Sequence, residues 1–177
     1  MKTTLFYGAI MGFIGILLNY ALYFLGFHDS AEKMHSAQMI SAILGIGAGV
    51  VCLVLSARAR RTETPASEPF GYGRSLLACF LTSLWSTCIG TLSWVIYIGV
   101  VNPGIRDIMV QGELTKLEAK GLSSAQIEQS EGMIRMMMGP VPQGLIGFCF
   151  GLIIWTLLSL IVAAFVRRPA AGIVAAA

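Results

Sequence analysis

The chain has 177 residues, of which 56% are hydrophobic and 12% are charged, and its formal net charge is +3. A soluble domain normally carries about 25% charged residues, so the composition argues against one. The length suits a single domain, residues 1–177, and no nucleic-acid partner is expected.

Apolar residues gather into four long blocks that contain no Asp, Glu, Lys, Arg or His. Each block reaches the ~20 residues that a helix needs to cross the hydrocarbon core of a bilayer. A helix satisfies its own backbone hydrogen bonds, which lipid cannot do. We therefore expect an all-α, polytopic membrane protein with transmembrane helices at about residues 5–27, 37–57, 75–101 and 144–166.

The turn after the first block holds the two histidines of the chain, His28 and His35, with Asp29 and Glu32 between them. Glu32 and His35 form Glu-x-x-His, a spacing that places both on one helical face and ligates iron or manganese in some helix bundles. Such sites need two of these motifs and further carboxylates. A solvated turn is therefore the favoured interpretation, and a metal site at His28, Glu32 and His35 is the alternative.

Residues 58–74 are charged and contain two prolines, which predicts a flexible cytoplasmic linker between two helical hairpins. The linker ends in Gly-Tyr-Gly, a sequence also found in potassium-channel filters. A filter needs Thr-Val before it and a position deep in the membrane, whereas Glu-Pro-Phe precedes Gly-Tyr-Gly in this chain and Arg74 follows it. We interpret the stretch as a hinge, with Phe70, Tyr72 and Arg74 as anchors at the membrane interface.

The segment 102–143 is too long for an unstructured connection in a compact protein. It contains a capping box at Ser123 and Gln126, and its apolar residues recur at helical spacing. We expect an extracytoplasmic amphipathic helical hairpin at residues 103–138. Met133, Met136 and Met137 share one face, where thioether sulfurs would suit Cu(I) as an alternative to packing against lipid or a partner.

Small residues occur at spacings that let transmembrane helices pack closely. The expected packing set is Gly8, Gly12, Gly45, Gly49, Thr82, Ser86, Gly90, Gly147 and Gly151. One such face forming a dimer is the alternative. Trp85 and Trp155 fall at similar depth and are expected on helices that pack together. Trp94 and Tyr97, near the outer end of the third helix, are expected to be interfacial anchors.

The distribution of charge predicts the orientation. With the N-terminus inside, the cytoplasmic segments carry seven basic residues and two acidic ones, and the opposite side carries five basic residues and seven acidic ones. Basic residues near helix ends resist translocation, so both termini are expected in the cytoplasm, with Arg167 and Arg168 anchoring the end of the fourth helix.

The stretch PFGYGRSLLACFLTSLWSTCIGTLSWVIYIGVVNPGI resembles the membrane family called domain of unknown function 4199. Phe70-Gly71 opens its third helix and Asn102-Pro103 stands at the outer end. A charged amphipathic insert and a glycine-containing fourth helix that ends in basic residues extend the likeness over nearly the whole chain. The resemblance implies a bacterial four-helix protein of the inner membrane, and it carries over no catalytic residues.

Functional signals are sparse. The absence of charged residues within the spans argues against proton-coupled transport, and no nucleophile with a paired base and no phosphate loop is present. The leading hypothesis is a non-enzymatic interaction protein or accessory subunit, without cofactor, that contacts the lipid bilayer and forms a homo-oligomer or binds other membrane proteins. The alternatives are an oligomeric transporter or channel for a small neutral solute, based on the hydroxyls of the third helix, and a Cu(I)-handling protein.

Overall fold

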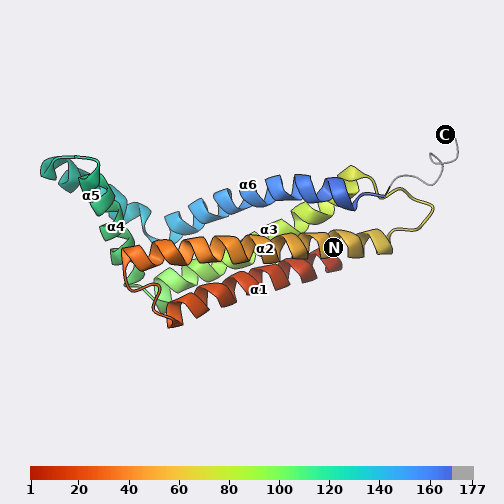
Figure 1. The fold of residues 1–177 in the computed structure, drawn as a ribbon, viewed down its shortest axis with the longest axis horizontal. Helices are drawn as coiled ribbons and strands as arrows, with labels where there is room; N and C mark the ends of the chain where they lie inside the picture. The colour runs from red at the N-terminus through yellow and green to blue at the C-terminus, as the bar shows by residue number, and fades with distance from the viewer. Residues whose placement is uncertain (169–177) are drawn as a thin grey trace.

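The computed structural model describes residues 1–168, and within them the chain forms six α-helices and one π-helical turn (Figure 1). The elements in chain order are α1 (Lys2–Phe24), α2 (Ala31–Glu63), α3 (Tyr72–Ile96), the π-helical turn η1 (Tyr97–Val101), α4 (Ile105–Ala119), α5 (Ser124–Met137) and α6 (Pro140–Val166). The predicted all-α class is confirmed.

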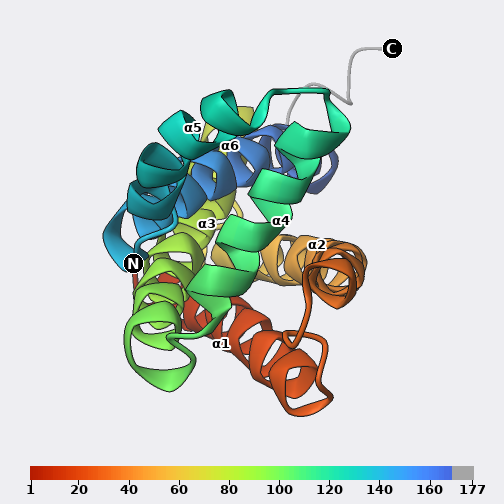
Figure 2. The ribbon, with the colours of Figure 1, turned by 90° about the vertical axis from the view of Figure 1, so that its left-hand side faces the viewer.

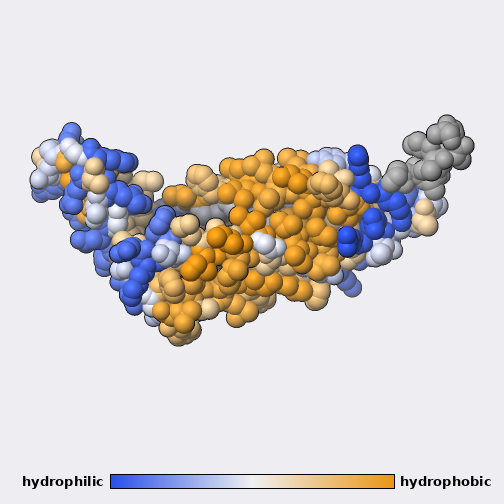
Figure 3. All heavy atoms as spheres, viewed as in Figure 1, coloured by the Kyte–Doolittle hydropathy of each residue, from blue (hydrophilic) through white to orange (hydrophobic). Residues whose placement is uncertain are grey.

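Four helical segments are long and apolar enough to cross a membrane: Lys2–Phe24, Ala31–Glu63, Tyr72–Val101 and Pro140–Val166. They run in alternating directions, which brings the N-terminus, the α2–α3 connection and the end of α6 to one end of the bundle (Figure 1). On the face that Figure 3 shows, apolar residues form a belt along the bundle and hydrophilic residues gather at its two ends. This pattern fits a multi-pass membrane protein.

The helix α3 is central, because it packs against α1, α2 and α6. Its buried face is made of small and hydroxyl side chains, which let the backbones approach closely. The Thr82 hydroxyl lies 2.6 Å from the Ser56 hydroxyl on α2, and the Ser83 hydroxyl lies 3.2 Å from the Ser159 hydroxyl on α6. These hydrogen bonds join α3 to the helices on either side.

The helix α2 departs most from its predicted range, residues 37–57. The helix α2 begins at Ala31, where the Ser30 hydroxyl accepts a hydrogen bond from the Lys33 amide, and it continues to Glu63. It therefore includes residues 58–63 of the expected linker. The helix ends there because Pro65 follows Thr64, and proline disfavours a helical conformation in the residue before it.

The remaining part of the linker is fastened to the end of α6. The Arg168 amide donates to the Phe70 carbonyl oxygen over 2.8 Å. The Arg168 guanidinium donates to the carbonyl oxygens of Pro65 and Glu68, each at 3.0 Å. These contacts hold the chain between α2 and α3 against the end of the bundle.

The helices α4 and α5 lie at the other end of the bundle. The helix α4 crosses that end (Figure 2), with Ile105 and Val110 buried beneath it. At the base of the α4–α5 hairpin, the Arg106 guanidinium donates to the Arg135 carbonyl oxygen at 2.6 Å, and Arg135 pairs with Asp107 at 3.1 Å. The predicted capping box at Ser123 begins α5. We call α4 and α5 together the arm.

Candidate functional site

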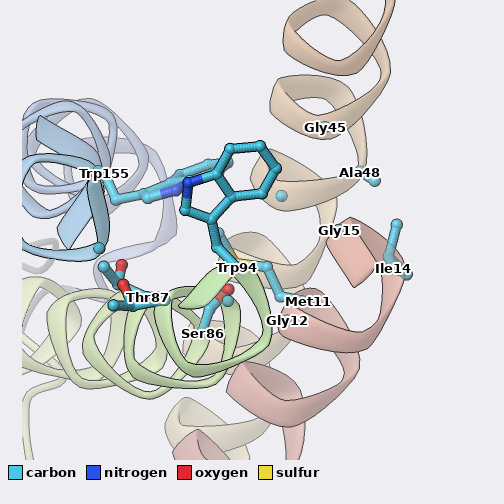
Figure 4. A pocket seen from close by; sticks show the side chains of 16 residues that line it. Met11, Gly12, Ile14, Gly15, Gly45, Ala48, Ser86, Thr87, Trp94 and Trp155 are labelled. Carbon is cyan, nitrogen blue, oxygen red and sulfur yellow. The ribbon is translucent and has the colours of Figure 1, made fainter. Parts of the chain in front are cut away.

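A cavity of about 380 Å³ lies in the bundle between the four long helices (Figure 4). Residues from α1, α2, α3 and α6 line it, and half of them are glycines. The glycines are Gly12, Gly15, Gly45, Gly49, Gly90, Gly144, Gly147 and Gly151. Most of the wall is therefore apolar and built from backbone rather than from side chains.

The glycines of the expected packing set fall into two groups. Gly8 and Gly12 contact α3 closely: a Cβ on Gly8 would lie 2.7 Å from the Thr82 carbonyl oxygen, and one on Gly12 would lie 3.0 Å from Ile89. Gly49 lies against the Trp155 ring, and a Cβ on Gly151 would lie 3.4 Å from the Thr87 methyl group.

Gly45, Gly90 and Gly147 form the second group, in which the structure differs from the packing expectation. A Cβ on any of them would meet no atom within 4 Å. These three positions face the open space of the cavity rather than a neighbouring backbone. Their lack of a side chain creates volume instead of bringing two helices into contact.

The polar groups of the cavity come from α3 and from two tryptophans. Ser86, Thr87 and Thr91 of α3 line it, and the Thr87 hydroxyl donates to the Ser83 carbonyl oxygen. Ser86 is only 7% exposed, and its hydroxyl makes no hydrogen bond to any part of the chain that the structure describes. It points into the cavity beneath the indole rings of Trp94 and Trp155 (Figure 4).

The positions of the three tryptophans agree only in part with the prediction from the sequence. Trp85 and Trp155 are on helices that pack together, α3 and α6, but Trp85 lies beside Gly8 on α1 and Trp155 covers Gly49 on α2. Trp94 lines the cavity and stacks on Tyr97 with ring centroids 5.5 Å apart. Trp94 therefore faces the bundle interior instead of acting as an outward interfacial anchor.

A buried aromatic cluster adjoins the cavity at the arm end. Tyr97 is completely buried in η1, with Tyr20 and Tyr23 at ring distances of 5.7 Å each. Its hydroxyl lies 2.5 Å from His28 Nδ1 and accepts a hydrogen bond from Asn102 Nδ2 at 3.0 Å. The tautomer of His28 decides whether Nδ1 or the tyrosine hydroxyl is the donor in this hydrogen bond.

His28 is therefore not part of a solvated turn, because it is 5% exposed. Gly26 has a φ of +76°, and the amides of Gly26 and Phe27 bond to the carbonyls of Tyr23 and Leu22. This is the glycine-terminated helix end that reverses the chain, and it turns His28 back onto the bundle. Burial lowers the pKa of His28, and the nearby Asp29 carboxylate partly opposes this effect.

The candidate metal ligands are not brought together. His28 faces Tyr97, whereas Glu32 and His35 are exposed on α2 and line a second cavity of about 550 Å³ beside α4. Within residues 1–168, no group of three or more His, Cys, Asp or Glu side chains is placed to hold a metal ion. Met133, Met136 and Met137 are exposed on α5, outside both cavities.

The expected membrane anchors at the other end of the bundle differ in exposure: one is buried and the others lie at the surface. Phe70 is 3% exposed and therefore lies in the protein interior, and its carbonyl oxygen accepts a hydrogen bond from the Arg168 amide. Tyr72 is partly exposed and donates to the Leu160 carbonyl oxygen at 3.2 Å. Arg74 is at the surface, where it pairs with Glu68 at 2.7 Å. Arg167 is exposed beyond the end of α6.

Sequence reasoning missed the His28–Tyr97 pair and the cavity. The signal for the cavity was present: glycines recur on every long helix, and those of α2 and α6 face one space. The signal for the histidine was weaker, since only the glycine two residues earlier hints at a reversal of the chain.

Comparison with known proteins places the chain in one family. The family described as "Protein of unknown function (DUF4199)" matches residues 6–168, which include α1 from its fifth residue on, the other three long helices and the arm. No curated protein and no solved structure matches the chain. Because the match covers most of the sequence, the chain belongs to the DUF4199 family of proteins of unknown function.

Proposed function

We propose that this protein is a non-enzymatic interaction protein, or accessory subunit, of a membrane complex. The observation that carries the proposal is the surface of the arm. The helix α5 has no buried residue, and Met133, Met136 and Met137 are 65%, 66% and 45% exposed. Methionine side chains are flexible and polarisable, and they are frequent on surfaces that bind protein partners.

The position of the methionines favours a partner beside the arm. They lie on the last turns of α5, a few residues before α6 begins at Pro140. Exposed apolar side chains that gather in one place mark interaction sites more often than isolated ones do. A second copy of the chain or another membrane protein would cover them, and the bilayer would cover the apolar belt of the bundle (Figure 3).

The proposed location is the bacterial inner membrane with the arm outside. One end of the bundle carries seven basic residues: Lys2, Arg58, Arg60, Arg61, Arg74, Arg167 and Arg168. Basic segments are retained in the cytoplasm, so this end and both termini would be cytoplasmic. The bacterial origin rests on the resemblance to the family.

Photo-crosslinking in native membranes tests the proposal. A photoreactive amino acid at position 136 should give one discrete crosslinked product, whereas the same amino acid at Glu118, an exposed position at the end of α4, should not. The triple variant Met133→Gln, Met136→Gln, Met137→Gln should reduce co-isolation of the crosslinked protein in mild detergent. A monomer without adduct at position 136 would contradict the proposal.

Transport through an oligomeric pore is less well supported. That alternative depended on the hydroxyls of the third helix facing a path between copies. Instead, Thr82 and Ser83 bond to Ser56 and Ser159 within the same bundle. The Thr82 and Ser83 hydroxyls therefore join α3 to its own neighbours and do not line a path between subunits.

A further inference from the structure

The central cavity opens sideways, toward the surface that a bilayer would cover. Gly45 on α2 and Gly147 on α6 both line it, and neither would meet another atom within 4 Å if it carried a Cβ. The surface is hollowed between these two helices on the arm side of the bundle (Figure 3). A molecule dissolved in the hydrocarbon core would therefore reach the cavity without passing through water.

The volume is that of a ligand site rather than of a packing defect. Protein interiors are close-packed and contain few voids larger than a water molecule. Small-molecule sites typically measure about 300–1,000 Å³, and this cavity measures about 380 Å³. A mainly apolar wall does not retain water, but it binds apolar molecules.

The residues that line the cavity favour a neutral ligand that carries a hydrogen-bond acceptor. No Asp, Glu, Lys, Arg or His side chain lines the cavity, so an ion would have no partner there. Ser86 is more than nine-tenths buried, and its hydroxyl points into the cavity and makes no hydrogen bond within residues 1–168. The indole N–H groups of Trp94 and Trp155 make no hydrogen bond to the same residues. Buried hydroxyl and indole N–H groups usually donate a hydrogen bond, so a ligand with an acceptor oxygen would satisfy them.

Depth distinguishes between two sources of that oxygen. Ser86 follows Arg74 by twelve residues on α3, which is ~18 Å along the helix axis. The hydrocarbon core is ~30 Å thick, so the hydroxyl lies near its middle. The ester carbonyls of a phospholipid are held near the headgroups, whereas a carbonyl compound free in the core reaches this depth.

We propose that the cavity binds a neutral, lipid-soluble carbonyl compound of the quinone type, which enters between α2 and α6 and accepts a hydrogen bond from Ser86. The Trp94 and Trp155 rings contact its flat face, and the exposed backbone of the glycines gives it room. This binding site is separate from the arm surface of the proposed function.

The test uses the full chain in lipid nanodiscs, with decylubiquinone as the probe and tryptophan fluorescence as the signal. Two of the three tryptophans line the cavity, so bound quinone should quench fluorescence with a saturable dependence on concentration. Gly147→Leu fills the cavity and should abolish the saturable component. Gly132→Leu, on α5 and also in open space, is the matched control and should leave it unchanged.

Ser86→Ala removes one hydrogen bond, so binding should weaken about 2- to 12-fold. Gly45→Leu fills the cavity from the opposite wall, and it provides the same test if Gly147→Leu fails to fold. Saturable quenching that survives both leucine variants, or that is absent from the wild type, overturns the proposal. Phospholipid retained by the wild type but lost from Gly147→Leu, with no quenching by the quinone, assigns the cavity to lipid and also overturns it.

Discussion

At Gly8, the helix α1 contacts the backbone of α3, and alanine at this position tests whether that contact holds the bundle together. A methyl group on Gly8 would come to 2.7 Å from both the Thr82 carbonyl oxygen and Trp85 Cβ. Neither atom is the end of a flexible side chain, so the two helices would have to separate. Overpacking of this kind costs about 1–3 kcal/mol of the free energy of unfolding.

Gly15→Ala is the matched control, because it lies on the same helix and its new methyl group would meet no atom within 4 Å. Alanine exceeds glycine in helix propensity by about 1 kcal/mol, so this control should be unchanged or slightly stabilised. A chain of this size loses about 2–4 °C of Tm per kcal/mol, which predicts a Tm about 2–12 °C lower for Gly8→Ala. Thermal unfolding in detergent, followed by circular dichroism, measures both. Equal melting of the two variants would refute the close-contact argument.

Three further predictions concern the two ends of the bundle. Tyr97→Phe removes the hydroxyl that joins His28 and Asn102, and it should cost about 1–3 kcal/mol in chemical unfolding because the buried His28 and the half-buried Asn102 each lose a partner. Burial holds the pKa of folded His28 below its ordinary value of 6.5, so the unfolded chain binds the proton more readily. Stability that is fully present above pH 6.5 should therefore fall as acid titrates the folded histidine, and a His28→Gln variant should lose this dependence between pH 7 and 5. Arg168→Ala removes the bonds to the carbonyls of residues 65 and 68, so limited proteolysis should cut this connection faster than in the wild type, while an Arg167→Ala control should not change the rate.

The long helices could be predicted because lipid imposes strong rules on composition. Four uncharged blocks of sufficient length allow few other structures, and the capping box at Ser123 specifies the start of α5 from local chemistry alone. The ends of α2 were less predictable. Its extension through residues 58–63 is polar, and a hydropathy pattern does not distinguish a charged helical turn from a linker.

The site was only partly predictable because it depends on how each helix is rotated about its axis. Trp94 and Tyr97 stand near a helix end, where aromatic residues often face the lipid headgroups. In the folded chain both face inward, toward Tyr20, Tyr23 and His28. The contacts that decide this rotation come from α1 and from the turn after it, which lie far away in the sequence.

The paired glycines show how one sequence motif leads to two structures. Gly8 and Gly12 meet the backbone of α3, so their spacing brings two helices together. Gly45 and Gly49 have the same spacing, but the Trp155 ring of α6 lies against Gly49. The ring keeps α6 away from α2, and one turn closer to the arm Gly45 faces empty space across from Gly147. A glycine pair in a membrane helix therefore leaves space beside the helix. The size of the side chain on the opposite helix determines whether a neighbouring backbone or a ligand occupies that space.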